Sequence, residues 1–371
     1  MNDFNWLSVF YLFEYLKLRS MKNSVFLIGS YLSNDVKAAS SLFRITCDHQ
    51  GGNAVVEDLG LQSMELTHFS VKGSELYVAN KIFSYEGKYD GAISAYRMEG
   101  EGFLLTNERS AMGAGTVYTC ISMDGRFIYV CNYMDGNVVG YRLVGDGVGV
   151  PVWMERLHGS SVNRERQESP HPHAIEASPC GRYFAVADLG SDKVLLFECA
   201  GDNGVLSCNQ NLTIESAAGS GPRHVRFHPA YGHIFYVTHE MGAFIAAYKL
   251  DGQACTEVGN YLFPNAGQAG VSGAEIQFHP SGRYLYASSR GDNLIHQYSV
   301  EGSSGALVLV QSVFCGGNCP VSFDVSSNGR HLLVCNQHSD CVTLFDIHEE
   351  TGGVSFRSEF QISHPIMTCR M

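Results

Sequence analysis

The sequence has no excess of positive charge and few charged residues of either sign. Its 371 residues include 25 Lys and Arg against 37 Asp and Glu, which gives a formal net charge of −12. Because nucleic-acid binding depends on Lys and Arg that neutralise phosphates, this balance argues against a nucleic-acid partner. A small anionic substrate is compatible with it, provided that a local cluster of cations overcomes the overall repulsion.

Cysteine pairs at metal-binding or redox spacing are also lacking. None of the 12 cysteines belongs to a CxxC motif, and several, such as Cys131 and Cys335, lie inside apolar runs. Cys315 and Cys319 come nearest to a metal pair, but no second pair completes a four-ligand site. We expect mostly buried free thiols in a reducing compartment, with no disulfide framework, no metal site and no cofactor.

No apolar run is long enough to cross a membrane. Residues 4–18 are apolar but contain Glu14 and Lys17, are too short to span a bilayer comfortably and lack a cationic leader. We therefore expect no membrane partner. We interpret residues 1–20 as an appendage with a short helix, with Met21 as an alternative start, and residues 21–371 as a single domain.

What the sequence does contain is a repeat of about fifty residues. Seven apolar runs recur at spacings of 50, 52, 56, 51, 50 and 47, measured between Ile28, Val78, Val130, Val186, Val237, Ala287 and Val334. A second apolar run follows each of these seven runs. In most units a glycine turn lies directly before the first run, and another short strand lies before that turn. Because no long stretch has a period of 3.6 residues, an α/β fold is excluded. The pattern predicts an all-β fold, a seven-bladed β-propeller with four antiparallel strands per blade.

The first unit has no innermost strand of its own, because Val25 lies so near the start. The C-terminal segment 364–371 has the missing pattern, with Pro365-Ile366 corresponding to Pro222-Arg223. We predict that this segment closes the ring in blade 1 and leaves no open sheet edge.

The C-terminal segment is also relevant to the cellular location of the protein. The final tripeptide Cys369-Arg370-Met371 loosely resembles a C-terminal peroxisomal address, which its receptor must grip as a free tail. A paired closing strand would occupy that tail. We therefore expect a cytoplasmic protein, with a peroxisome-like organelle as the alternative.

Two columns of the repeat place ionisable side chains at one mouth of the central channel. The two inner strands of a blade form a hairpin, so the start of the first lies beside the end of the second. The residues that open the innermost strand are Val117, His173, Arg223, Ala274 and Val321, and those that follow the second strand are Tyr31, Lys81, Tyr133, Leu189, Glu240, Arg290 and Gln337. Four ionisable residues, His173, Arg223, Glu240 and Arg290, therefore converge on blades 4 to 6. By strand alternation, His171 shares the face of His173.

Each of these residues has a simpler interpretation when taken alone. His171 and His173 fit a metal pair, a general base with a neighbour, or two surface imidazoles. Arg290 fits an ion pair with Asp292 on the rim, and Glu240 with Arg223 fits a structural ion pair. Clustered at one channel mouth, they favour a functional site.

The four residues suit two reactions. Guanidinium groups supply paired donors for a carboxylate, a phosphate or a developing oxyanion, and an imidazole takes up a proton near neutral pH. Attack of an activated water on an ester fits this set, and so does proton transfer next to a carboxylate-bearing double bond. No signature marks a Ser, Cys or Lys nucleophile.

The chain resembles the seven-bladed propeller lactonases, which include propeller-type 6-phosphogluconolactonases and fungal 3-carboxy-cis,cis-muconate cyclases. The resemblance covers about residues 25–371 and is strongest over blades 4 to 7, where it rests on PHPHAIEASPCGRYFAVADLGSDKVLLF, GPRHVRFHP…THE, GAEIQFHPSGRYLYASSRGDN and GRHLLVCNQHSD. It implies a metal-independent mechanism with His173, Arg223, Glu240 and Arg290 as the catalytic residues. His239 stands where the family often has Asn, and we expect it to contact the substrate together with His171.

The first hypothesis is hydrolysis of 6-phosphoglucono-δ-lactone, a step of the pentose phosphate pathway, with Lys81 of the second column as an extra cation for the phosphate. The alternative is a lactonizing cycloisomerase that acts on 3-carboxymuconate, and the third hypothesis is a non-catalytic platform for binding proteins. Clustered ionisable groups at a channel mouth argue against the platform. We expect a monomer whose only partner is a small anionic substrate.

Overall fold

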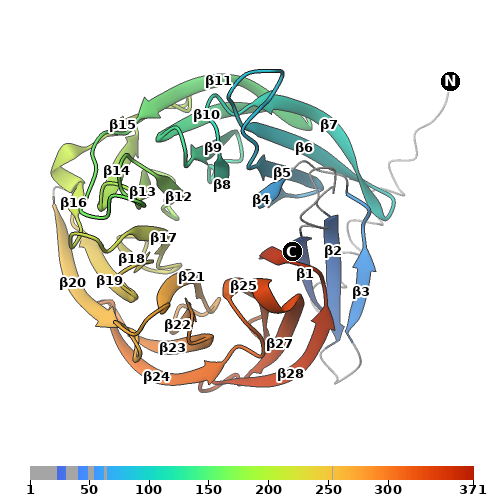
Figure 1. Cartoon of the computed structure of the whole chain (residues 1–371), viewed down its shortest axis with the longest axis vertical. Coiled ribbons are helices and arrows are strands. Elements are labelled where there is room, and N and C mark those ends of the chain that lie inside the picture. The colour runs from blue at the N-terminus through green and yellow to red at the C-terminus, as the bar shows by residue number, and fades with distance from the viewer. Residues whose placement is uncertain (1–22, 31–40, 49–53, 62–64, 253) are drawn as a thin grey trace.

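A computed structural model describes residues 23–30, 41–48, 54–61, 65–252 and 254–371 of the chain. Seven antiparallel sheets stand around a central channel as the blades of a propeller, each with four strands in order from the channel outward (Figure 1). The predicted fold is confirmed. The predictions for residues 1–20, for Met21 and for Tyr31 lie outside the described residues.

Each blade runs outward from the channel in four strands. Blade 1 consists of β29 (Pro365–Arg370), β1 (Asn23–Ser30), β2 (Ser41–Asp48) and β3 (Val55–Asp58). Blade 2 consists of β4 (Leu66–Lys72), β5 (Glu75–Asn80), β6 (Ala92–Glu99) and β7 (Gly102–Ser110). Blade 3 consists of β8 (Thr116–Ile121), β9 (Phe127–Asn132), β10 (Asn137–Val144) and β11 (Gly147–Arg156). Blade 4 consists of β12 (Pro172–Ala177), β13 (Tyr183–Asp188), β14 (Lys193–Cys199) and β15 (Leu206–Cys208), with the short β16 (Ile214–Glu215) also paired to β14.

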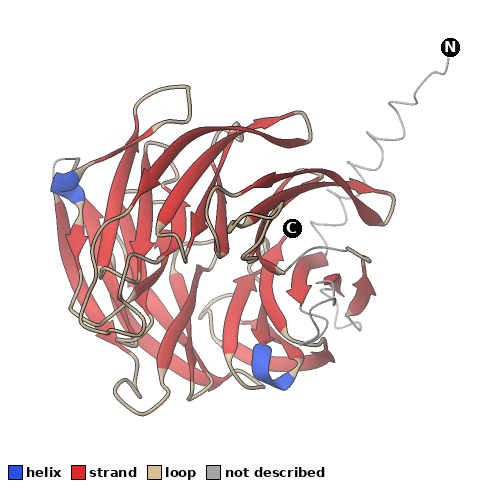
Figure 2. Cartoon of the chain, turned by 45° about the horizontal axis from the view of Figure 1, so that its top comes forward, coloured by secondary structure: helices blue, strands red, loops and turns tan. Residues whose placement is uncertain are grey.

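The remaining blades follow the same plan. Blade 5 consists of β17 (Pro222–Phe227), β18 (Ile234–His239), β19 (Phe244–Leu250) and β20 (Cys255–Leu262). Blade 6 consists of β21 (Ser272–Phe278), β22 (Tyr284–Arg290), β23 (Leu294–Glu301) and β24 (Ala306–Phe314). Blade 7 consists of β25 (Pro320–Val325), β26 (His331–Asn336), β27 (Cys341–Ile347) and β28 (Val354–Gln361). Two short 3₁₀ helices, η1 (Gln210–Leu212) and η2 (Gln337–Ser339), are the helical elements of the described chain (Figure 2). No described helix is long and apolar enough to span a bilayer.

The repeated apolar position lies at the centre of the second strand in every blade. All seven of its side chains are fully buried. They belong to apolar clusters between neighbouring blades, as where Val186 of blade 4 packs in one cluster with Tyr129 and Val138 of blade 3. Burying each of the valine and isoleucine side chains at this position contributes about 1.5–3 kcal/mol, so the spacing of the repeat reflects the stacking of blade on blade.

The C-terminal strand closes the ring, as predicted. β29 pairs antiparallel with β1, from Phe26 opposite Arg370 to Ser30 opposite Pro365. The backbone N–H of Arg370 also donates to Asp324 of blade 7 at 2.8 Å, and its guanidinium lies 3.4 Å from the same carboxylate. Blade 1 is therefore held together by both ends of the chain, and its innermost edge is covered.

A β-bulge near the start of each innermost strand positions the channel mouth. In blades 2 to 5 and 7 the pairing register shifts around the second residue of the strand, which leaves one residue without a partner opposite. These extra residues are Thr67, Val117, His173, Arg223 and Val321. Bulges redirect the side chain that they carry. The column that the sequence predicts at the channel mouth is thus the column of bulge residues.

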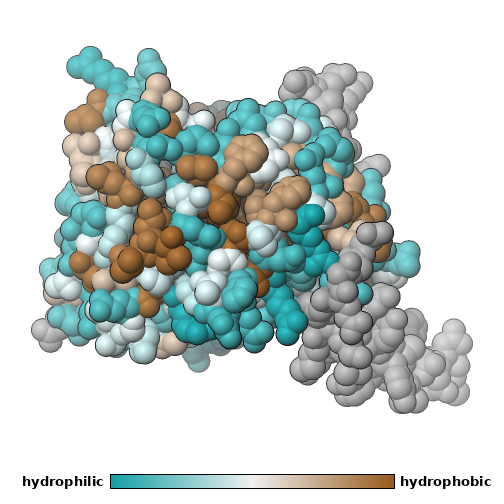
Figure 3. Space-filling view, turned by 90° about the horizontal axis from the view of Figure 1, so that it is seen from below, coloured by the Kyte–Doolittle hydropathy of each residue, from teal (hydrophilic) through white to brown (hydrophobic). Residues whose placement is uncertain are grey.

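All twelve cysteines are free thiols, as predicted, and seven of them are buried. Outside the ring, the outer strands expose a few apolar side chains, including Val308, Val310 and Phe314 of β24. Figure 3 views the wall that includes β24 and shows apolar side chains interspersed with hydrophilic ones.

Candidate active site

The structure brings the four predicted catalytic residues together around one carboxylate. The Nε of Arg223, on the bulge of β17, donates to Oε2 of Glu240 at 3.1 Å. Arg290, the last residue of β22 in the next blade, places Nη2 3.1 Å from the same oxygen. Glu240 itself directly follows β18. The hairpin geometry of adjacent blades therefore makes a two-arginine cluster, and in this structure Arg290 pairs with Glu240 rather than with Asp292.

A glycine permits this approach of blade 6 to blade 5. The guanidinium of Arg290 also donates to the carbonyl of Gly273 at 3.3 Å, and the N–H of Gly273 donates to the carbonyl of Glu240 at 2.8 Å. A Cβ at Gly273 would lie only 2.6 Å from the carbonyl oxygen of His239. Any larger residue would push the blades apart at the point where Arg290 reaches Glu240.

Glu240 is ionised despite its burial. Its side chain is almost entirely shielded from solvent. Burial acts to raise the pKa of Glu240, but the charges of Arg290, Arg223 and Arg166 outweigh it, and the pKa lies below its ordinary value. The carboxylate therefore orients the guanidinium groups as a fixed anion and is not available as a general acid near neutral pH.

His173 stands on the bulge of β12 beside this cluster. Its ring lies edge-on to the ring of Tyr133, with 5.9 Å between centroids, and 5.3 Å from the ring of His224. Burial, reinforced by the charge of Arg223, lowers the pKa of His173 well below its ordinary value. Its Nδ1 has no hydrogen-bond partner among the described residues. His173 is therefore a neutral imidazole that is able to accept a proton.

His171 lies behind the site. It is buried, stacks on the ring of Tyr133 at 4.3 Å, and bonds through Nδ1 to the carbonyl of Tyr133 at 2.7 Å and through Nε2 to Glu168 at 3.1 Å. Because Tyr133 in turn contacts His173, His171 acts on the site by positioning Tyr133.

The side chains of the other two predicted substrate-binding residues are engaged or placed elsewhere. His239 is fully buried, stacks on Phe244 at 4.1 Å and bonds to Ser220 at 3.0 Å. Lys81 follows β5 in blade 2, across the ring from blade 5 (Figure 1). Within the described chain, neither side chain contacts the four clustered residues. Their contact with substrate stays a prediction.

Sequence reasoning missed Arg166. It belongs to the connection between β11 and β12, and its Nη2 donates to Oε1 of Glu240 at 2.9 Å. Glu240 thus carries three guanidinium partners. Arg166 sits in a polar loop without strand alternation, so no sequence signal placed it at the channel mouth.

Sequence reasoning also missed His224, although it follows Arg223 within the GPRH string. Nε2 of His224 lies 3.1 Å from Nη1 of Arg223, and Nδ1 of His224 lies at hydrogen-bond distance, 3.0 Å, from Oε1 of Glu275. Its position after the bulge was the available signal, because the same position in blade 6 holds Glu275 and in blade 3 holds Tyr118.

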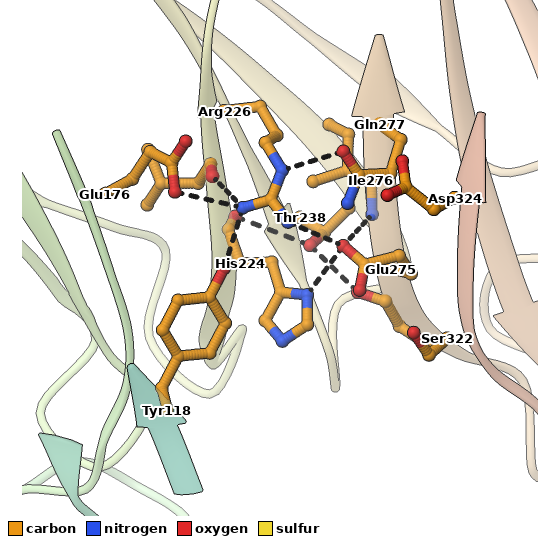
Figure 4. Close-up of polar contacts among 12 residues, drawn as sticks. Tyr118, Glu176, His224, Arg226, Thr238, Glu275, Ile276, Gln277, Ser322 and Asp324 are labelled. Atoms are coloured by element: carbon orange, nitrogen blue, oxygen red, sulfur yellow. Dashed lines mark hydrogen bonds and ion pairs between the residues drawn. The ribbon is translucent and has the colours of Figure 1, made fainter. Parts of the chain in front are cut away.

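A buried polar network forms the floor of the site (Figure 4). Arg226 is its centre and donates to the hydroxyl of Tyr118 at 2.8 Å, to Gln277 at 3.1 Å and to Glu176 at 3.3 Å, with Glu275 3.4 Å away. These side chains come from the innermost strands of blades 3 to 6. Because the network is extensively hydrogen-bonded within the channel, it holds His224, and through it Arg223, in place.

No group of three or more His, Cys, Asp or Glu in the described chain is arranged to hold a metal ion. Of the two histidines that also fit a metal pair, His171 stacks on the ring of Tyr133 and His173 lies edge-on to it. Acid–base chemistry by His173 and anion stabilisation by the arginines are what the arrangement offers.

Known proteins are similar to this one over most of its length. A protein of Staphylococcus saprophyticus without an assigned function is 29% identical over 333 residues, which cover 88% of this chain and 93% of that protein. The periplasmic gluconolactonase of Pseudomonas aeruginosa superposes with a TM-score of 0.84 at 25% identity, covering 94% of this chain and 99% of that one. A protein from Lactobacillus plantarum, at a TM-score of 0.85 and 24% identity over 94% and 99% of the two chains, shows the fold alone.

The family described as lactonase, 7-bladed beta-propeller, matches residues 25–369. That span includes every blade, the arginine cluster around Glu240 and His173. The chain belongs to the seven-bladed β-propeller lactonase family.

Proposed function

We propose that the protein hydrolyses 6-phosphoglucono-δ-lactone. The observation that carries this proposal is the neutral imidazole of His173 beside guanidinium groups that exceed their carboxylate partner in charge. An ester hydrolase that uses water needs a proton acceptor and a fixed cation for the oxyanion, and the site supplies both. Family membership supports the lactone, and the gluconolactonase from P. aeruginosa supports a sugar lactone.

The reaction proceeds by addition of water across the ring ester. His173 takes one proton from water as the oxygen attacks the lactone carbonyl, and the carbonyl electrons move onto oxygen. Arg223, with Arg290 beside it, stabilises that oxyanion. When the carbonyl re-forms, the bond to the ring oxygen breaks and His173 returns its proton to that oxygen. The product is the open hydroxy acid.

Glu240 contributes without entering the reaction. One of its oxygens accepts from Arg223 and forms an ion pair with Arg290, so their planar groups are oriented before substrate arrives. Preorganised donors stabilise charge without having to reorient during the reaction. Burial, and after it the charge of Arg223, lowers the pKa of His173 and keeps its imidazole neutral.

The direct test is an assay of purified protein on 6-phosphoglucono-δ-lactone, followed by acid release and corrected for spontaneous hydrolysis. We expect saturable turnover well above the spontaneous rate. Absence of turnover on that lactone and on glucono-δ-lactone would overturn the proposal. A parallel assay on 3-carboxymuconate tests the cycloisomerase alternative, and inactivity in all three assays would favour the non-catalytic platform.

We also propose that the protein acts as a cytoplasmic monomer. Cys369 and Arg370 belong to β29, and the N–H of Met371 donates to the carbonyl of Val25 at 3.0 Å. A C-terminal tail that is held in this way is poorly available to a receptor that grips it in extended form.

A further inference from the structure

The long connection between β11 and β12 is tied down against the channel mouth. Gln167 is fully buried, and its amide donates to the carbonyl of Leu189 at 2.9 Å and accepts from the N–H of Asn163 at 3.2 Å. The side chain of Asn163 accepts in turn from the N–H of Arg166 at 3.2 Å. Arg166 therefore extends from a backbone held by an internal turn and by the buried residue next to it.

The three arginines around Glu240 differ in depth. Their side chains are 7% exposed for Arg223, 23% for Arg290 and 44% for Arg166. The site thus has an inner end, where Arg223 lies near His173, and an outer end at Arg166. Within the described chain, Arg166 makes its side-chain contacts through Nη2 alone, to Glu240 at 2.9 Å and to the hydroxyl of Tyr133 at 3.5 Å.

The charges at the mouth do not balance. Three guanidinium groups face one carboxylate, and His173 and His224 both have a pKa lowered well below the ordinary value by burial, so these rings add no positive charge. Around Glu240 two positive charges are left over, and the adjacent network of Arg226 with Glu176 and Glu275 offsets one of them. The chain as a whole has a net charge of −12. A half-exposed ion pair contributes little stability, and uncompensated buried charge is costly. The remaining positive charge favours a ligand that carries negative charge.

We propose that Arg166 is the specificity-determining residue of this site and that it binds the phosphate at the far end of the lactone. This inference rests on the proposed function. The reacting carbonyl must lie at the inner end, within reach of His173 and Arg223, so the charged end of the substrate points to the outer end. There the planar guanidinium of Arg166 offers donors for a phosphate dianion.

The test compares phosphorylated and unphosphorylated lactones in two variants. In Arg166→Ala we expect the ratio of kcat/KM for 6-phosphoglucono-δ-lactone over glucono-δ-lactone to fall by about tenfold or more, mainly through KM, which corresponds to about 1.4 kcal/mol. Arg164→Ala is the matched control, since Arg164 is an exposed arginine on the same loop, and its ratio stays at the wild-type value. An equal loss for both lactones in Arg166→Ala, or no loss, would overturn the inference.

Binding of the products separates this inference from the proposed reaction. By calorimetry, we expect wild type to bind 6-phosphogluconate more tightly than gluconate and Arg166→Ala to lose that preference. If wild type hydrolyses neither lactone but shows this preference and its loss, the proposed reaction fails and the role of Arg166 stands. If wild type has no preference for the phosphorylated compound in either assay, the role of Arg166 is refuted. Thermal melting of each variant confirms that it is folded.

Discussion

Arg223 donates to one oxygen of Glu240 at 3.1 Å, and Nη2 of Arg290, from the neighbouring blade, forms an ion pair with the same oxygen at 3.1 Å. One carboxylate thus sets the orientation of both guanidinium groups and joins blade 5 to blade 6. The arrangement is preorganised for an anion, because neither arginine has to move to stabilise an oxyanion on a bound substrate.

Lysine at either arginine position will weaken catalysis. In Arg223→Lys and in Arg290→Lys we expect kcat/KM on 6-phosphoglucono-δ-lactone to fall by about tenfold or more, because lysine keeps the charge and loses the planar pair of donors. Steady-state kinetics on the two purified variants measures the effect. Wild-type kinetics in both would remove the anion-binding role of these residues.

Alanine at His173 will abolish most turnover. We expect kcat to fall by about a hundredfold or more, as is usual when a general base is removed, with a melting temperature near that of wild type. Stability is retained because the ring sits at the channel mouth, on a bulge, outside the apolar clusters between blades. A large drop in melting temperature combined with unchanged activity per folded molecule would assign His173 a structural role instead.

The pH profile of kcat/KM will reflect the lowered pKa of His173. Burial and the charge of Arg223 lower that pKa well below the ordinary value of about 6.5, so the reactive neutral form persists at lower pH. As pH falls, activity is retained through about pH 6.5 and is lost only below it. Initial rates between about pH 5 and 7.5, corrected for spontaneous hydrolysis, measure the acid limb. An acid limb centred at or above the ordinary imidazole pKa would contradict the neutral, desolvated imidazole.

Removal of residues 364–371 will destabilise the whole domain. The deletion strips β29 from β1, breaks the contacts between Arg370 and Asp324, and opens a sheet edge at the channel. We expect a much lower midpoint of chemical unfolding or insoluble protein. Deletion of residues 1–20 is the control, and it leaves stability unchanged. A soluble and fully active protein without residues 364–371 would show that the ring does not need its closing strand.

Location depends on the same strand. A fluorescent protein fused at the N-terminus, with Met371 left free, should give a diffuse cytoplasmic signal, because β29 and the bond from Met371 to Val25 hold the tail. The matched variant carries one additional residue after Met371, and we expect the same diffuse signal. A punctate signal that disappears in this variant would replace the cytoplasmic assignment by an organelle, and would mean that the closing strand releases Cys369-Arg370-Met371.

The sequence by itself determined the blades, their number and the closure of the ring. Apolar alternation, glycine turns and a repeat of constant spacing are local signals, and they come from the strands that pack blade on blade. The same regularity placed His173, Arg223, Glu240 and Arg290 at one mouth, because equivalent positions of a repeat lie at equivalent places in the ring.

Tertiary structure alone decided what surrounds those residues. Arg166 reaches Glu240 from a loop 74 residues away, and a loop has no period from which its position can be read. His239 and Lys81 stand at repeat positions next to or within the column, but packing buries one against Phe244 and the ring places the other on its far side. The pKa of His173 likewise follows from burial and from Arg223, which only the folded ring brings together.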